Sequence, residues 1–137
     1  MVRAMKNERT ILIIDDDAVL VELYRVKFVR AGFAVLQAEN GAKAIELLKS
    51  GVRPSVILLD LLMPNMDGFA FIQEAKHKGI SLPPLIVFTS QEDDIHKVKS
   101  FALGATQFVQ KANATPAEIL EKIQLLLDEK KATGPLR

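Results

Sequence analysis

The fold of this chain is decided by the stretch Val-Ile-Leu-Leu-Asp-Leu-Leu-Met-Pro-Asn-Met-Asp-Gly, which occupies residues 56–68. Its first four residues are apolar and end abruptly at Asp60, a pattern typical of a strand buried on both faces of a parallel sheet. Pro64 cannot donate a hydrogen bond to a strand ladder and disfavours helix at the residue before it. The sequence therefore predicts a central strand with Asp60 at its carboxyl end, the edge where open α/β sheets bind ligands. An isolated aspartate at the end of a strand more often only caps a turn. A second strand that ends in the same way is needed to favour a ligand site.

A second apolar run, residues 10–14, ends in the same way, at Asp15, Asp16 and Asp17. Adjacent carboxylates repel one another, and acidic residues are unfavourable in strands. We expect Asp17 to cap the helix that follows. The other two carboxylates are then available to bind a hard divalent cation, which prefers oxygen ligands. If the two strands are neighbours, these two carboxylates and Asp60 converge.

Length and composition exclude several classes of protein. The chain of 137 residues suits one domain, and 49% hydrophobic with 26% charged residues is ordinary globular composition. The absence of cysteine excludes disulfides and thiolate chemistry, and a net charge of +1 argues against direct nucleic-acid binding. The apolar runs are too short to span a membrane, and residues 1–9 lack the apolar core of a secretory signal. We therefore expect a cytoplasmic protein.

The remaining sequence alternates between short apolar runs and segments with helical spacing. We expect strands at residues 10–14, 33–38, 56–59, 85–88 and 106–110, each followed by a helix. Such alternation gives right-handed βαβ units and a parallel sheet covered on both faces. The predicted fold is α/β: a flavodoxin-like, doubly wound, five-stranded parallel sheet of order 2-1-3-4-5 with five helices. The predicted domain covers residues 10–128, between an N-terminal tail of residues 1–9 and a C-terminal tail of residues 129–137.

Helical spacing also predicts which side of each helix faces the sheet. In the first helix we expect a core stripe at Leu20, Leu23, Tyr24 and Phe28, with Val21, Val26 and Val29 outside it. Among those valines, Val21 and Val29 are our candidates for part of a docking face. In the later helices the expected inward residues are Ala42, Ile45 and Leu48, with Ala44 as a further candidate; Phe69, Ile72 and Ala75, with Phe71 to one side; Ile95, Val98, Phe101 and Ala102; and Ile119, Ile123, Leu126 and Leu127. Residues 90–93 and 115–118 have the pattern of capping boxes at the starts of the last two helices.

The predicted strand order places the first and third strands side by side, so Asp15, Asp16 and Asp60 share one pocket. Thr89 and Lys111 reach this pocket from the ends of the fourth and fifth strands. Such a set suits phosphoryl chemistry, with Asp60 as the nucleophile that forms a mixed anhydride. We expect Mg²⁺ as the cation because the ligands are few and hard. The lysine would pair with a phosphoryl oxygen and the threonine would donate a hydrogen bond.

Several motifs, in this order and spacing, resemble the receiver domain of bacterial two-component response regulators. They are Asp15-Asp16, Asp60 with Leu61-Leu62-Met63-Pro64, Asp67-Gly68, Val87-Phe88-Thr89-Ser90, Gly104-Ala105 and Phe108-Val109-Gln110-Lys111. The resemblance runs from about residue 10 to about residue 128. It implies a single-domain, CheY-like phosphorelay switch and no independent metabolic activity.

The resemblance further implies a role for each residue. A histidine kinase or a histidine phosphotransfer protein would pass its phosphoryl group to Asp60, while Asp15, Asp16 and the backbone carbonyl of Leu62 complete the Mg²⁺ site. The Thr89 hydroxyl would then move toward the phosphoryl group, and Phe108 would swing inward. The face formed by the fourth helix, fifth strand and fifth helix would change protein partners as a result.

Two positions depart from the family pattern. The family usually has proline after the strand-five lysine, often in a cis bond, whereas Ala112 follows Lys111 here. A cis bond to alanine would cost about 3 kcal/mol, so either the strained bond is kept or the loop is rebuilt. The positions that flank the phosphoryl group are Leu62 and Gln91. The apolar Leu62 cannot orient an attacking water by a hydrogen bond, so we expect slow self-dephosphorylation.

Two other functions remain possible on the sequence. A haloacid-dehalogenase-like phosphohydrolase usually needs a second acid two residues after the nucleophile, and that residue is Leu62 here. A non-phosphorylated, receiver-like scaffold that only binds proteins is the main alternative. His77 and His96 have no companion at metal-ligand spacing, and we expect both to be solvated helix residues.

Overall fold

The computed structural model describes residues 9–91 and 93–133. Five parallel strands form one sheet in the order β2-β1-β3-β4-β5, which confirms the predicted fold. The strands are β1 (Thr10–Ile14), β2 (Ala34–Ala38), β3 (Val56–Leu59), β4 (Leu85–Thr89) and β5 (Gln107–Gln110). The helices are α2 (Ala18–Arg30), α3 (Gly41–Lys49), α4 (Gly68–His77), α5 (Asp94–Ala102), the short 3₁₀ helix η1 (Lys111–Asn113) and α6 (Pro116–Thr133).

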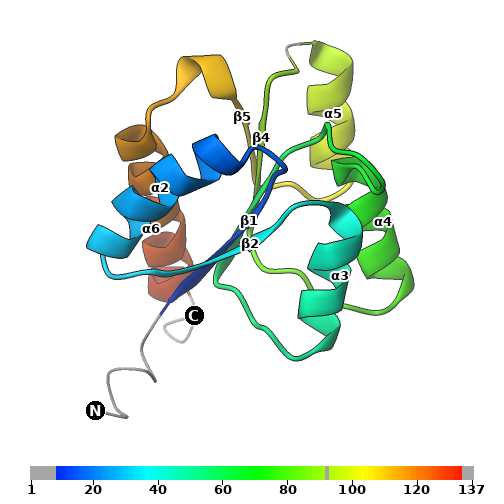
Figure 1. Cartoon of the computed structure of the whole chain (residues 1–137), viewed down its shortest axis with the longest axis horizontal. Helices are drawn as coiled ribbons and strands as arrows, with labels where there is room; N and C mark the ends of the chain where they lie inside the picture. Colours follow the sequence, from blue (N-terminus) through cyan, green and yellow to red (C-terminus); the bar gives the residue numbers. More distant parts are fainter. Residues whose placement is uncertain (1–8, 92, 134–137) are drawn as a thin grey trace.

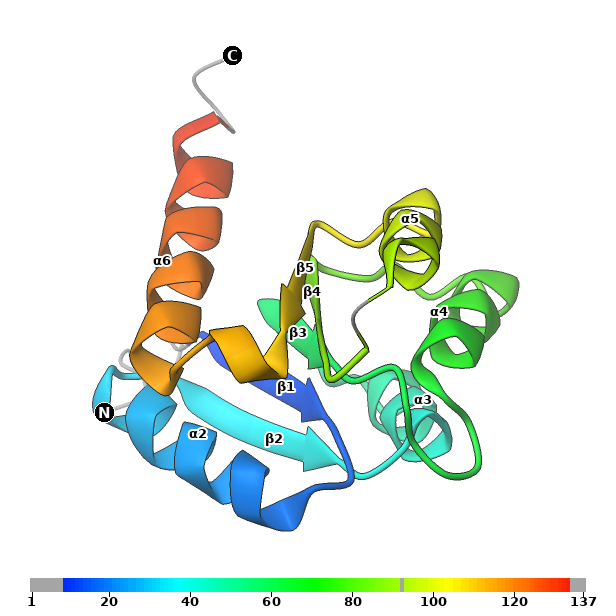
Figure 2. The same ribbon diagram turned by 90° about the horizontal axis from the view of Figure 1, so that it is seen from above.

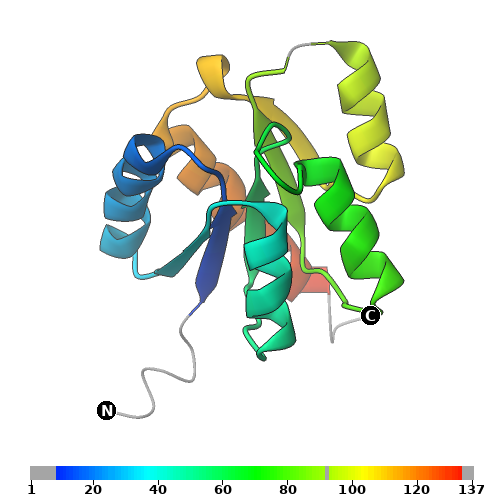
Figure 3. The same cartoon turned by 45° about the vertical axis from the view of Figure 1, so that its right-hand side comes forward.

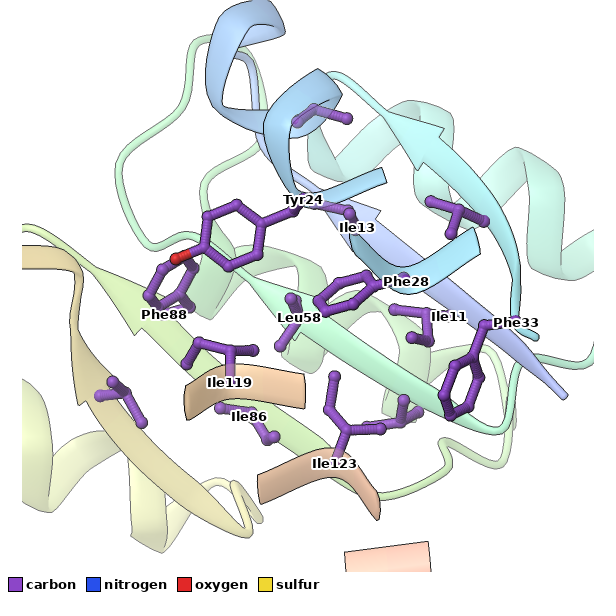
Figure 4. Close-up of a cluster of buried hydrophobic side chains, with 14 of the residues drawn as sticks. Ile11, Ile13, Tyr24, Phe28, Phe33, Leu58, Ile86, Phe88, Ile119 and Ile123 are labelled. Carbon is purple, nitrogen blue, oxygen red and sulfur yellow. The ribbon is translucent and has the colours of Figure 1, made fainter. Parts of the chain in front are cut away.

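The helices cover both faces of the sheet, with α2 and α6 on one face and α3, α4 and α5 on the other (Figures 1 and 2). Alternate side chains of the central strands therefore enter two separate cores. Apart from Thr10 and Thr89 at the ends of two strands, every residue of β1, β3 and β4 is apolar, because both faces are buried. On the α2–α6 side, Tyr24 packs edge to face against Phe28 and Phe88, with ring centroids 5.7 and 5.3 Å apart (Figure 4).

The strand register determines where the acidic residues meet. Ile14 of β1 is paired with Leu59 of β3, so Asp15 and Asp60 are the next residues of two adjacent strands. The backbone N–H of Asp60 donates to the Ile14 carbonyl at 2.9 Å, and the N–H of Asp15 donates to the Ala38 carbonyl at 3.0 Å. Both aspartates are therefore fixed by the sheet itself.

The predicted core stripe of α2 is partly wrong. Tyr24 and Phe28 are buried as predicted, but the third buried residue is Val21, at 1% exposure, and Leu23 is 59% exposed. This helix carries apolar residues around most of its circumference, so spacing alone leaves the choice of face open. Packing of Tyr24 against Phe88 on β4 decides it. Our choice of Val21 as a docking residue is wrong for the same reason.

The prediction for α5 is also wrong. Ile95 and Val98 are 78% and 67% exposed, Phe101 and Ala102 are exposed as well, and the buried residue of this helix is Ser100. The hydroxyl of Ser100 donates to the His96 carbonyl at 2.7 Å, which allows a small polar residue to face the interior. Its N-cap is Asp93, whose carboxylate accepts from the His96 N–H, and not the predicted Ser90.

Other local predictions fared better. Asp17 caps α2 by accepting from the Leu20 N–H at 3.1 Å. Thr115 and Glu118 form the predicted capping box at the start of α6, with reciprocal bonds of 2.9 and 3.2 Å. In α3 the buried side chains are Ala44, Ile45 and Leu48; in α4, Phe71, Ile72 and Ala75; and in α6, Ile119, Ile123 and Leu127. Three residues predicted to face inward, Ala42, Phe69 and Leu126, are only partly buried. The last helix runs to Thr133, past the boundary expected near residue 128.

Candidate functional site

Three carboxylates meet at the carboxyl edge of the central strands. One oxygen from each of Asp15, Asp16 and Asp60 lies within 4.8 Å of the others. Asp15 and Asp60 are buried, whereas Asp16 is exposed. Two buried carboxylates and a third at the surface provide a strongly negative set of hard oxygen donors, which fits a divalent cation such as Mg²⁺. The structure thus brings together all three acids that the sequence singled out.

Lys111 provides the positive charge of the pocket. Its Nζ lies 2.7 Å from Asp15 Oδ2 and 3.4 Å from Asp60 Oδ2, and the side chain is largely buried. Lys111 begins the 3₁₀ helix η1, and the described residues contain no cis peptide bond. Of the two alternatives for the segment after β5, the structure has the rebuilt loop, which forms a short helical turn. From this turn the ammonium of Lys111 still reaches Asp15 and Asp60.

Burial and charge set the protonation of this pocket. Burial raises the pKa of the Asp60 carboxyl above its ordinary value, against the lowering effect of Lys111, and the nearby Asp15 raises it further. Smaller lowering effects come from the Leu62 N–H and the Thr89 hydroxyl. Burial by itself would lower the pKa of Lys111, but its bond to Asp15 and the two negative charges outweigh that effect and raise it.

Thr89 and Phe108 lie where the strand order predicts. Thr89 ends β4 and is fully buried, and its Oγ1 accepts from the Gln91 N–H at 3.3 Å. Phe108 is paired in register with Val87 and packs, half-buried, against the core on the α3–α5 face. Their proposed switching roles remain predictions.

Comparison with known proteins decides the family. The family model for the response regulator receiver domain matches residues 11–124. The chain belongs to this family.

The receiver is 32% identical to the transcriptional regulatory protein ResD of Bacillus subtilis over 123 residues, which are 88% of this chain and 49% of ResD. It is 33% identical to the transcriptional regulatory protein GltR of Pseudomonas aeruginosa, over 88% of this chain and 50% of GltR. The chain thus spans about half the length of these curated relatives.

Solved structures give the same assignment. A CheY-like receiver domain protein from Methanospirillum hungatei JF-1 superposes with a TM-score of 0.82 at 25% identity, over 93% of this chain and 100% of that one. Chemotaxis protein CheY4 of Vibrio cholerae gives a TM-score of 0.77 at 25% identity, over 86% of this chain and 98% of that one. The protein is therefore a CheY-like receiver of two-component signalling with an acidic pocket.

The loop between β3 and α4 contains a feature of the receiver that the sequence analysis missed. Its residue Met66 accepts a backbone hydrogen bond from the N–H of Gly41, the first residue of α3, at 3.0 Å. The pair Asn40-Gly41 reads in the sequence only as the boundary of a helix. A contact between two segments 25 residues apart has no local signal, so it had to come from the structure.

The remaining features of the receiver lie outside the acidic pocket. His96 contacts the Asp93 carboxylate and stacks on Phe69, with ring centroids 5.7 Å apart, so it is less solvated than expected. His77 is exposed at the end of α4. In the described part of the chain, no helix has the length and apolar character needed to cross a membrane.

Proposed function

We propose that this receiver accepts a phosphoryl group on the carboxylate of Asp60 from a phosphohistidine donor. The donor would be a histidine kinase or a histidine phosphotransfer protein. A carboxylate oxygen of Asp60 attacks phosphorus, the P–N bond to the donor histidine breaks, and the product is an acyl phosphate with a neutral donor imidazole after protonation. The observation that carries the proposal is the convergence of three carboxylates and one ammonium at a single strand edge.

Each residue of the pocket has a defined part in this reaction. Asp15, Asp16, Asp60 and the backbone carbonyl of Leu62 would bind Mg²⁺, which supplies charge neutralisation between the acceptor and the incoming phosphoryl oxygens. Lys111 is within reach of Asp60, so its ammonium can pair with an oxygen of the transferred group. The buried Thr89 hydroxyl borders the same carboxylate and can donate a hydrogen bond to that group.

The readout proposed for the phosphorylated state is a change of partners on the face formed by α5, β5 and α6. Its support is the exposed apolar surface of α5, which carries Ile95, Val98 and Phe101. The new charge on Asp60 would draw Thr89 away from the Gln91 N–H, and that bond leads into the loop before α5. Inward movement of Phe108 would follow in the space that Thr89 leaves.

The phosphodonor is proposed to dock on α2. The exposed apolar residues Val19, Leu23 and Val26 follow one another at intervals of four and three, a spacing typical of a seam between packed helices. Val19 follows Asp16 by three residues in the sequence, so this seam begins close to the acidic pocket. A helical donor can therefore contact α2 while presenting its phosphohistidine to Asp60.

Intact mass separates the receiver from the scaffold, and a parallel assay with a generic phosphate ester separates both from a hydrolase. Intact mass is recorded after incubation with acetyl phosphate, with and without Mg²⁺, on the wild type and on Asp60→Asn. A Mg²⁺-dependent gain of one phosphoryl group, absent in the variant, is the expected result. No gain under any condition would favour the non-phosphorylated scaffold, and rapid turnover of a generic phosphate ester would favour a hydrolase.

The domain limits remain part of the proposal. We place the functional unit at residues 10–128, with residues 1–9 and 129–137 as flanking segments. A protein trimmed to residues 10–128 should retain phosphorylation at the rate of the full chain. A large loss of rate or of folding would show that the flanking segments belong to the unit, as the extension of α6 to Thr133 would allow.

A further inference from the structure

We infer that Gly41, at the start of α3, is a positioning residue for the metal site, because it holds the loop of residues 61–67 in place. This loop supplies the Leu62 carbonyl that the proposed function assigns to Mg²⁺, so the inference rests on that function. The start of α3 and the loop before α4 lie at the same end of the sheet (Figure 3). Gly41 itself would touch neither metal nor phosphoryl group.

A direct backbone contact joins the two segments. The N–H of Gly41 donates to the Met66 carbonyl at 3.0 Å, and Gly41 is buried. The start of α3 is itself fixed, because the buried Asn40 side chain caps the helix by accepting from the Lys43 N–H at 2.9 Å. The loop is therefore attached to a rigid helix end.

This contact leaves no room for a side chain at position 41. A Cβ atom there would lie 2.8 Å from the Met66 carbonyl oxygen, 2.8 Å from its Cγ and 3.0 Å from its Cβ. One of the crowded atoms belongs to the backbone, so a change of side-chain rotamer cannot relieve the clash. At Gly51, beyond the other end of the same helix, an added Cβ would meet nothing within 4 Å.

The loop also needs support from outside itself. Its far end is fixed where the Gly68 N–H donates to the Leu61 carbonyl at 3.1 Å. Between these anchors, Asn65 adopts a φ of 65°, a left-handed conformation that residues other than glycine seldom occupy. Asparagine tolerates this conformation better than most residues, and contacts from neighbouring segments help to select it. The bond from Gly41 to Met66 is adjacent to Asn65 and provides such a contact.

Two experiments on the full chain test the inference. The first is a calorimetric titration with Mg²⁺ of the wild type, Gly41→Ala and the matched control Gly51→Ala. The control strains a glycine of positive φ just beyond the other end of α3, where an added Cβ meets nothing within 4 Å. Loss of a group that orients a metal ligand typically weakens binding by about tenfold or more, and we expect this for Gly41→Ala. The control should lose stability in urea but bind Mg²⁺ as the wild type does.

The second experiment uses the wild type alone, so it holds even if Gly41→Ala fails to fold. Hydrogen exchange of the Gly41 amide is compared with and without Mg²⁺, and we expect the metal to slow it. Two outcomes would overturn the inference and leave the proposed function standing. One is an unchanged exchange rate of the Gly41 amide while Mg²⁺ protects residues 61–67; the other is equal Mg²⁺ affinity of Gly41→Ala and wild type. A wild type that binds no Mg²⁺ would overturn the proposed function and the inference with it.

Discussion

Lys111 lies closer to Asp15 than to the proposed phosphoacceptor: its Nζ is 2.7 Å from Asp15 Oδ2 and 3.4 Å from Asp60 Oδ2. Asp15 is also a proposed metal ligand. The ammonium and a divalent cation therefore compete for the same carboxylate, and binding of one weakens the hold of the other.

Replacing Lys111 with methionine should tighten Mg²⁺ binding by about tenfold, because the carboxylates lose the ammonium that pairs with Asp15 and Asp60. Phosphorylation by acetyl phosphate should slow at the same time, since the phosphoryl oxygens lose their partner. Calorimetric titration measures the first effect and intact mass the second. Lys97→Met, at an exposed site on α5, is the control. Weaker Mg²⁺ binding by Lys111→Met would contradict the competition.

The raised pKa of Asp60 predicts the pH dependence of stability. Burial raises this pKa in the folded protein above its ordinary value of 3.8, so ionisation of Asp60 destabilises the folded state. The penalty is full above the folded pKa, declines as the pH falls through it, and vanishes below the unfolded value. Asp60→Asn should therefore be more stable than the wild type at pH 7, and the difference should disappear in acid.

Urea unfolding of both proteins at a series of pH values measures this difference. The exposed Glu121→Gln on α6 is the control, and it should stay within about 0.5 kcal/mol of the wild type at every pH. A variant less stable than the wild type at pH 7, with a deficit that disappeared in acid, would show that the Lys111 ion pair outweighs burial.

Leu62 should determine how long the phosphoryl group persists. Its side chain is 52% exposed beside the acceptor and offers no hydrogen bond to an attacking water. Leu62→Asn should shorten the phosphoryl lifetime by about tenfold by orienting that water. The decay of phosphorylated protein is followed by mass, with Leu36→Asn on the edge strand β2 as the control. An unchanged lifetime in Leu62→Asn would count against this role.

Adjacent faces of α2 should respond in opposite ways to a carboxylate. Val21→Asp places a charge in the core and should cost about 3 kcal/mol or more in unfolding free energy, because Val21 is almost fully buried. Leu23→Asp should leave stability and phosphorylation by acetyl phosphate intact but slow phosphotransfer from a protein donor. Urea unfolding and transfer from a phosphorylated histidine phosphotransfer protein test the pair. Equal transfer rates for Leu23→Asp and wild type would remove α2 as the docking site.

The sequence by itself determined the features that depend on local chemistry. Apolar runs broken by carboxylates predicted strands that end at Asp15 and Asp60, and short side chains with a free oxygen predicted the caps at Asp17 and Thr115. Alternation of strand and helix then limited the sheet to a few topologies, of which the observed order was the predicted one. Convergence of the acidic residues follows from that order alone.

The tertiary structure decided the features that depend on contacts between distant segments. The α2 helix carries apolar residues around most of its circumference, so packing such as that of Tyr24 on Phe88, and not spacing, selects Val21 over Leu23 as its core residue. The α5 helix exposes Ile95, Val98 and Phe101, which its periodicity assigned to the core. Ser100 is buried instead, and its hydroxyl donates a hydrogen bond to the His96 carbonyl. Two interactions join residues far apart in the chain: the ion pair of Lys111 with Asp15 and the hydrogen bond from Gly41 to Met66. No local sequence pattern predicts either of them.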